Sequence, residues 1–190
     1  MSSWPKFMVL IVYILSSVGA AERATYKLLN AYEDCRSGTK NVRQHDSKLS
    51  YRVILENESK PLDCHYEFEM YNKNFRKNYG FHVYFEDLQL INGDYIQFGR
   101  DSGIIGFPTY ESQHYSGNKS NLSYLEMEDF EFDLWIKIKN TSYKPKLNLT
   151  ITIVRKNCNE DGGRWRNCPN HNFCVHKDFF CDGYHNCPKR

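Results

Sequence analysis

The sequence predicts an all-β protein, an antiparallel β-sandwich that is followed by a small disulfide-rich C-terminal module. One observation is that apolar and polar residues alternate in several segments, so each segment would form a strand with one buried face. Such strands bury these faces by packing two sheets against each other. The second observation is the cysteine spacing: five of the seven lie at or after Cys158, behind more than ninety residues that contain none. A short segment of this kind needs disulfides to fold.

The first twenty residues are typical of a signal peptide. Lys6 is followed by an apolar run over residues 7–15, and the small residues Val18 and Ala20 stand before a cleavage point at Ala21. The run is too short to span a bilayer, and no other stretch of the chain is long and apolar enough. The mature chain is therefore expected in an oxidising compartment, where its cysteines would form disulfides. Residues 21–34 are expected to be an N-terminal extension.

The strands of the sandwich are predicted from residues that alternate with a period of two. Turn signals rich in Asn, Gly, Asp and Ser separate them, near residues 78–80, 92–94, 101–103 and 116–118. Trp135 falls on the polar side of its strand, so it is either a contact for a partner or covered by a neighbouring loop. The inward residues are Tyr51, Val53 and Leu55; Tyr66, Phe68 and Met70; Phe81, Val83 and Phe85; Phe132, Leu134, Ile136 and Ile138; and Leu147, Leu149, Ile151 and Ile153.

Five Asn-x-Ser/Thr sequons support passage through the secretory pathway. Asn148 lies between two inward leucines and so on the wet face of its strand, and Asn140 follows the end of another strand. A loop rich in Gly, Ser and Asn is expected around residues 116–121. The predicted glycosylation sites are Asn57, Asn118, Asn121, Asn140 and Asn148.

Four features of the segment 35–158 resemble a CUB domain, an extracellular jelly-roll-like β-sandwich. They are the spacing of Cys35 and Cys64, the stretch Cys64–Phe68, the acidic stretch with Phe85-Glu86 and Gly93–Ile96, and the late core strand Phe132–Ile138. The resemblance implies a disulfide between Cys35 and Cys64. The second disulfide of that family is absent, and its positions correspond to Ile91 and Ile104, which we expect to fill the core instead.

The same resemblance implies a calcium site on Glu86 and Asp94, which would also shape the region that contacts a basic residue of a partner. The third carboxylate should lie near Lys139-Asn140-Thr141, which has none. Backbone carbonyls and water would have to complete a weak calcium site. The alternative, which we favour, is a solvated acidic pair with no resident cofactor.

The cysteine spacing from Cys168 to Cys187, with Cys181-Asp182-Gly183, resembles a low-density-lipoprotein-receptor class A module over residues 159–190, preceded by Cys158 as its first cysteine. The resemblance implies disulfides Cys158–Cys174 and Cys168–Cys187 and leaves Cys181 unpaired, so we expect a truncated product or a shortened module. Asp182 matches one calcium ligand, but Asn186 and Lys189 stand where carboxylates are expected, and this site is incomplete. The alternative of a zinc site, disfavoured by the signal peptide, would use His171, Cys174, His176, Cys181 and His185.

No catalytic motif is found, and the seven histidines are dispersed, with His65 and His82 expected on the surface. We therefore expect no enzyme. A formal net charge of +2 with scattered Lys and Arg disfavours nucleic acid as a partner. The favoured function is binding of an extracellular protein or receptor ectodomain, as a receptor accessory protein, an adaptor or a ligand-binding ectodomain. The alternatives are a secreted effector or carbohydrate-binding protein, and the non-catalytic arm of an extracellular protease. The expected location is secreted, or the ectodomain of a membrane protein if the chain is a fragment.

Overall fold

The computed structural model describes residues 25–37, 40–44, 49–55, 58–70, 78–91, 93–101, 108–111, 114–127, 131–158, 163–180 and 182–187. The predicted signal peptide, the sequon at Asn57, Ile104 and Cys181 lie outside these residues. No described helix is both long and apolar enough to cross a bilayer.

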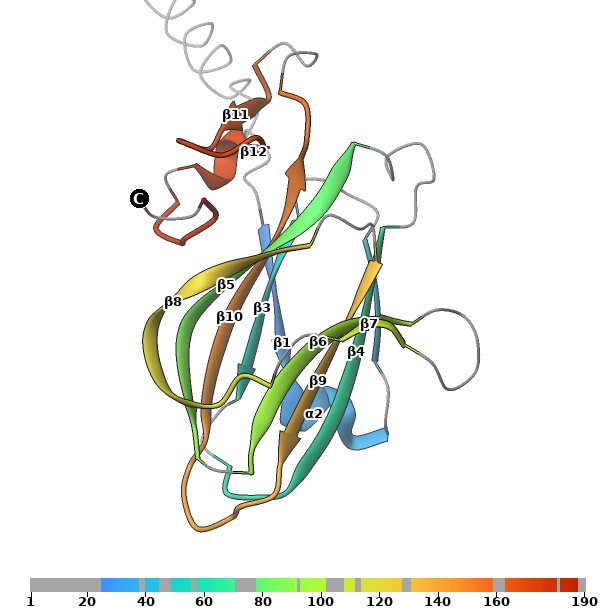
Figure 1. Cartoon of the computed structure of the whole chain (residues 1–190), viewed down its shortest axis with the longest axis vertical. Coiled ribbons are helices and arrows are strands. Elements are labelled where there is room, and N and C mark those ends of the chain that lie inside the picture. The colour runs from blue at the N-terminus through green and yellow to red at the C-terminus, as the bar shows by residue number, and fades with distance from the viewer. Residues whose placement is uncertain are drawn as a thin grey trace, which may run out of the picture.

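Two packed β-sheets make up the described part of the chain, and the all-β prediction is confirmed (Figure 1). Most strand pairs are antiparallel, but β1 pairs with β3 and β2 with β4 in parallel, which the sequence did not predict. Sheet A contains β1 (Thr25–Asn30), β3 (Leu49–Leu55), β10 (Lys146–Arg155), β5 (Tyr79–Leu90), β8 (Gly117–Met127), β12 (Cys174–His176) and β11 (Trp165–Asn167). Sheet B contains β2 (Lys40–Gln44), β4 (Leu62–Met70), β9 (Glu131–Ile138), β6 (Tyr95–Asp101) and β7 (Pro108–Glu111). The helical turns are α2 (Ala31–Asp34), η1 (Cys35–Ser37) and η2 (Lys177–Phe179).

The core lies between the sheets, and every inward residue predicted from the alternation is buried. Phe68 of β4 is at its centre, stacked on Phe132 at 4.8 Å and in edge contact with Tyr51 of sheet A at 5.5 Å. The prediction that Ile91 fills the core is wrong. Ile91 is 40% exposed at the end of β5, so it does not fill the core in place of a disulfide.

The described residues of the predicted N-terminal extension, 25–34, pack against the sandwich. Strand β1 pairs along its whole length with β3. Asn30 then caps α2, since its side chain accepts a hydrogen bond from the N–H of Tyr32. This turn brings Cys35 to Cys64 of β4, with their Cα atoms 5.2 Å apart, and the two form a disulfide that ties α2 and η1 to sheet B.

The described sequons lie at strands and strand ends. Asn118 and Asn121, expected in a loop, lie in β8, where Asn118 pairs with Gln89 of β5. Asn140 and Asn148 are both partly exposed, at the end of β9 and in β10. The Asn148 side chain accepts a hydrogen bond from Arg52 at 3.1 Å. Glycosylation of these sites stays a prediction.

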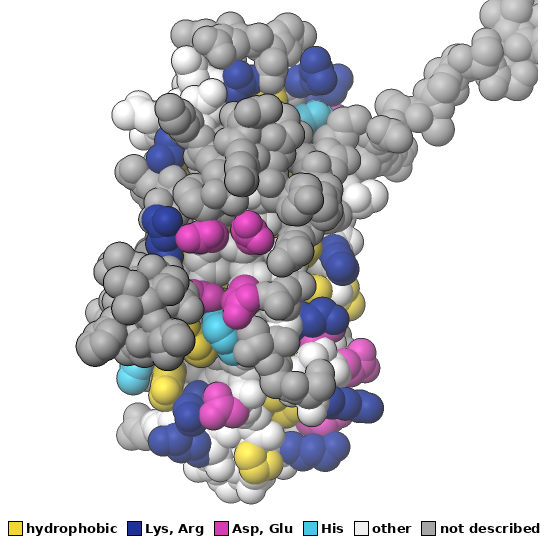
Figure 2. Space-filling model, turned by 90° about the vertical axis from the view of Figure 1, so that its right-hand side faces the viewer, with side chains coloured by type: hydrophobic (Ala, Val, Ile, Leu, Met, Phe, Trp, Pro, Cys, Tyr) yellow, Lys and Arg dark blue, Asp and Glu magenta, His cyan; other side chains and the backbone are white. Residues whose placement is uncertain are grey.

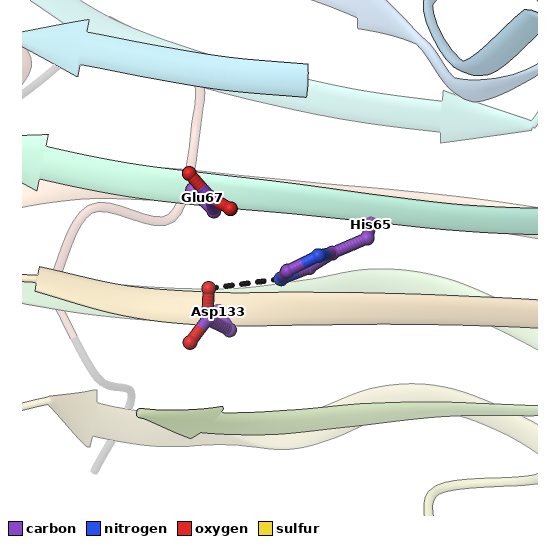
Figure 3. Close-up of side chains that lie close together, drawn as sticks. All are labelled: His65, Glu67 and Asp133. Atoms are coloured by element: carbon purple, nitrogen blue, oxygen red, sulfur yellow. Dashed lines mark hydrogen bonds and ion pairs between the residues drawn. The ribbon is translucent and has the colours of Figure 1, made fainter. Parts of the chain in front are cut away.

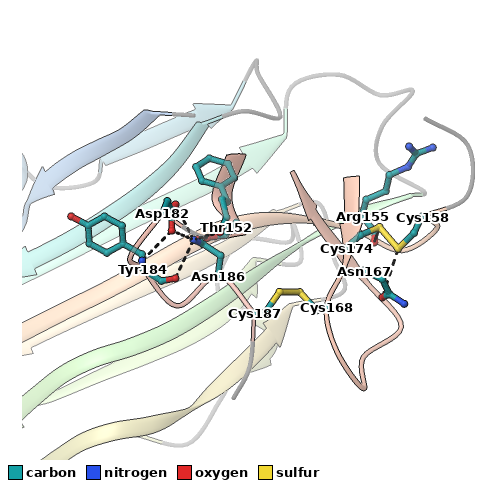
Figure 4. The surroundings of a disulfide bond; sticks show 11 residues. Thr152, Arg155, Cys158, Asn167, Cys168, Cys174, Asp182, Tyr184, Asn186 and Cys187 are labelled. Atoms are coloured by element: carbon teal, nitrogen blue, oxygen red, sulfur yellow. Dashed lines mark hydrogen bonds between the residues drawn. A yellow bond between two sulfur atoms is a disulfide. The ribbon is translucent and has the colours of Figure 1, made fainter. Parts of the chain in front are cut away.

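The C-terminal segment, residues 163–187, continues sheet A and folds back over its outer face (Figure 4). Strand β12 pairs with β10 through Cys174 and Arg155, and β11 pairs with β12. Disulfides join Cys158 to Cys174 and Cys168 to Cys187, the pairs that the resemblance implies. Val154 of β10 packs in a second apolar cluster with Phe173, Val175 and Cys168.

A buried hydrogen-bond network joins this segment to sheet A. Asn186 is 2% exposed, and its amide donates to the hydroxyl of Tyr26, to the carbonyl of Phe179 and to the carboxylate of Asp182. Its oxygen accepts from Thr152, which also contacts Ser50 at 2.9 Å. Buried polar groups are costly unless paired, so this network holds the segment in one position on the sheet.

His82 of β5, expected on the surface, is fully buried beneath this segment. Its ring lies 5.6 Å from that of Phe173. Burial lowers the pKa of His82 from 6.5 to about 3, and the nearby His171 lowers it further in the same direction. His82 therefore binds a proton below about pH 6.5 in the unfolded chain but only below about pH 3 in the folded chain. Acidification over this window lowers the free energy of unfolding.

We expect the free energy of unfolding to fall by about 2 kcal/mol through His82 alone when the pH drops from 7 to 5. Urea denaturation at both pH values would measure this loss in the wild type and in a His82→Phe variant. Whatever the stability of the variant at pH 7, its loss on acidification should be smaller by about this amount. Equal losses in the two proteins would show that His82 titrates normally in the folded state.

Candidate functional site

A cluster of one histidine and two carboxylates lies on the outer face of sheet B (Figure 3). His65 and Glu67 are two residues apart on β4, and Asp133 lies on the adjacent strand β9. The antiparallel register places Glu67 directly opposite Asp133 and His65 opposite Trp135. Since the inward residues of both strands fill the core, the alternate residues must share this outer face.

The three side chains are close enough to act together. His65 Nε2 lies 2.9 Å from Asp133 Oδ1, and one ligand atom from each of the three residues lies within 4.8 Å of the other two. Asp133 is 5% exposed, whereas His65 and Glu67 are partly exposed. The cluster thus combines one buried carboxylate with two side chains that reach solvent.

Aromatic rings flank this cluster on the same face. The ring of His65 stacks on Trp135 with centroids 4.9 Å apart and planes 14° apart, which fixes its orientation. Tyr95 of β6 stacks on His114 at 3.9 Å. Trp135 is partly exposed, so it is neither freely solvated nor fully covered.

Further carboxylates lie on this face, and some of them form ion pairs with cationic side chains. Lys137 pairs with Asp63 at 2.8 Å, and Arg100 pairs with Glu131 at 3.2 Å. Asp133 contacts His65, which is charged only when protonated. Figure 2 views the molecule from the side on which Figure 1 shows sheet B, and acidic side chains gather in the middle of that side. The face therefore offers negative charge beside aromatic surface.

Asp94, a calcium candidate, lies beside the segment after β9. It is 1% exposed. The backbone N–H groups of Lys139 and Asn140 donate to its Oδ1 at 2.6 and 3.1 Å, and the Tyr143 hydroxyl donates to its Oδ2 at 2.7 Å. Burial, together with the bond to Asp94, raises the pKa of Tyr143 to about 12, which keeps this donor protonated.

The other two candidates, Glu86 and Asp182, contact the C-terminal segment or lie in it. Glu86 Oε2 lies 3.1 Å from Nδ1 of His185. Asp182 accepts from the hydroxyl of Tyr26 and from the amide of Asn186. Calcium binds oxygen lone pairs, and some lone pairs of these three carboxylates accept hydrogen bonds from the protein. Calcium at Asp94, Glu86 or Asp182 stays a prediction.

Sequence reasoning missed the cluster of His65, Glu67 and Asp133. The signal that was present is local, a histidine and a carboxylate spaced by two on a half-buried strand. The pairing of β4 with β9 joins residues 68 positions apart, and no local pattern specifies that register.

No family model matches the sequence, and no curated protein matches it. Solved structures similar to the chain include the CUB1-EGF-CUB2 domains of rat MASP-1, with a TM-score of 0.42 and 14% identity over 60% of this chain. This chain covers 39% of that structure. Another is the MASP-1 CUB2 domain bound to Ca²⁺, with a TM-score of 0.43 and 15% identity, covering 62% of this chain and 99% of the other. A likeness this distant assigns neither a partner nor a ligand to the chain.

Proposed function

We propose that this chain is a non-catalytic, extracellular protein-binding unit, an adaptor or receptor accessory protein, which contacts its partner through the outer face of sheet B. The observation that carries the proposal is the difference between the two outer faces. The C-terminal segment covers part of the outer face of sheet A, where it contacts the buried residues His82 and Thr152. Apart from the buried Asp133, the described side chains on the outer face of sheet B are at least partly exposed, and carboxylates and aromatic rings gather there.

The chemistry of this face indicates the kind of partner. Aromatic residues are enriched in the centres of protein interfaces, and a surrounding set of charges selects a complementary surface. Among the side chains that the structure describes, the face carries Asp63, Glu67, Glu69, Glu131 and Asp133 against Lys137 and Arg100. We therefore propose a partner that presents a Lys- or Arg-rich surface.

The division of the chain and its location belong to the same proposal. We propose a signal peptide over residues 1–20, which would direct the chain out of the cell. It is followed by a CUB-like sandwich over 35–158 and a partial class A module over 159–190. Three disulfides in the described residues support an oxidising compartment. We propose that this module folds together with the sandwich, which is supported by the extension of sheet A through β11 and β12 and by the hydrogen bond of Asn186 to Tyr26.

The test is a binding screen of the secreted, multimerised chain against an array of extracellular domains. Glu67→Lys changes the proposed surface, and Glu33→Lys on the exposed side of α2 is the matched control with the same change of net charge. We expect Glu67→Lys to weaken binding of the wild-type partner at least tenfold, and Glu33→Lys to leave it within twofold. Wild-type binding should also weaken as salt is raised. A partner that binds Glu67→Lys as tightly as the wild type would refute the proposed surface.

A further inference from the structure

We propose that His65, Glu67 and Asp133 form a zinc-binding site on the outer face of sheet B. This inference goes beyond protein binding and stands whether or not the face has a protein partner. The site is separate from the calcium candidates Glu86, Asp94 and Asp182.

The first argument is charge. Glu67 and Asp133 stand directly opposite each other on neighbouring strands, and like charges in such a pair destabilise a sheet. The next pair along the strands, Glu69 and Glu131, has Arg100 bound to Glu131. Asp133 contacts His65 and is 5% exposed, where charge is screened less than at the surface. A divalent cation would offset the charge of both carboxylates.

The second argument is geometry. With metal–ligand bonds of about 2.1 Å, two ligands of a tetrahedral zinc ion lie about 3.4 Å apart. His65 Nε2 and Asp133 Oδ1 are 2.9 Å apart, so a small side-chain movement would bring them to this spacing. The ligand atoms of all three residues lie within 4.8 Å, so a rotation of the flexible, partly exposed Glu67 side chain would bring its oxygen into range.

The third argument is preorganisation and the choice of metal. The stack on Trp135 holds the His65 ring in place, and the strand pairing fixes the Cα positions of all three residues. An imidazole nitrogen with two carboxylates is a donor set for zinc, whereas calcium and magnesium prefer oxygen ligands alone. Three protein ligands leave a fourth position open to solvent, where water would bind.

The test is a zinc titration of the full secreted chain, purified through a tag without histidine, stripped with chelator and followed by isothermal calorimetry. The ligand variants are His65→Gln and Glu67→Gln. Asp63→Asn is the matched control, because Asp63 is an exposed carboxylate on the same strand and face that lies outside the cluster. Near-ultraviolet circular dichroism would show that each variant keeps the native fold.

We expect one zinc ion per chain at micromolar concentration, a loss of affinity of at least tenfold in both ligand variants, and a change of less than twofold in Asp63→Asn. X-ray absorption of the zinc-loaded protein should show one imidazole with oxygen ligands. Absence of binding at 100 µM zinc, or binding that both ligand variants retain, would overturn the proposal. Since zinc would alter the charge of the face, the partner screen is carried out in chelator, and failure of either experiment leaves the other standing.

Discussion

Replacing Phe68 with alanine is expected to lower the free energy of unfolding by about 3–5 kcal/mol, the range for removing a large aromatic side chain from a packed core. Phe68 is 1% exposed and stacks on Phe132 within sheet B. It also contacts Tyr51 and Phe81 of sheet A, so its ring fills space that both sheets share. Its removal leaves a cavity at the junction that holds the sandwich together.

Urea denaturation followed by tryptophan fluorescence would measure this loss. Phe68→Leu is the control, because it keeps most of the apolar volume and should cost distinctly less than the alanine variant. A loss below 1 kcal/mol in Phe68→Ala would mean that Phe68 is not at the centre of the core.

Removing the disulfide between Cys35 and Cys64 is expected to cost about 3–4 kcal/mol. The cysteines are 29 residues apart in the sequence, and a cross-link over a loop of this length restricts the unfolded chain by about that free energy. Both residues are buried, so the loss of packing adds to the entropic effect.

The double variant Cys35→Ala/Cys64→Ala would test this prediction without leaving a free thiol. Its denaturation midpoint should fall well below that of the wild type under non-reducing conditions. Reduction of the wild type with dithiothreitol also breaks the two C-terminal disulfides, so its midpoint should fall at least as far as that of the double variant. An unchanged midpoint in the double variant would show that this disulfide contributes little to stability.

The elements of the sandwich could be predicted because strand alternation is a local property. Tyr66 and Phe68, or Leu149 and Ile151, are placed on the buried face by the period of two alone, and the structure confirms each of them. Segments whose local sequence favours a turn but which pair as strands were harder to predict. The stretch around Asn118 has turn-forming residues, yet it belongs to β8, because pairing with β5 supplies hydrogen bonds that outweigh local preference.

What the sequence could not provide is contact between distant segments. His82 alternates with inward residues and would be a surface residue on an isolated sheet, but residues 163–187, some ninety positions later, cover it. The cluster on sheet B has the same origin, because the register between β4 and β9 brings Asp133 to His65 and Glu67. Both histidines lie on outward positions of their strands, and long-range packing alone makes their environments differ.

This difference between the two outer faces is the central claim, and the reactivity of the two histidines tests it most directly. Diethyl pyrocarbonate modifies accessible imidazoles, and peptide mass spectrometry would give the rate at each site in the native secreted chain. The side chain of His65 is 26% exposed, and His82 has no exposed surface. We expect His65 to be modified in the folded protein and His82 to react only after the C-terminal disulfides are reduced and the segment leaves the sheet. Modification of His82 at the rate of His65 in the native, oxidised protein would contradict the account.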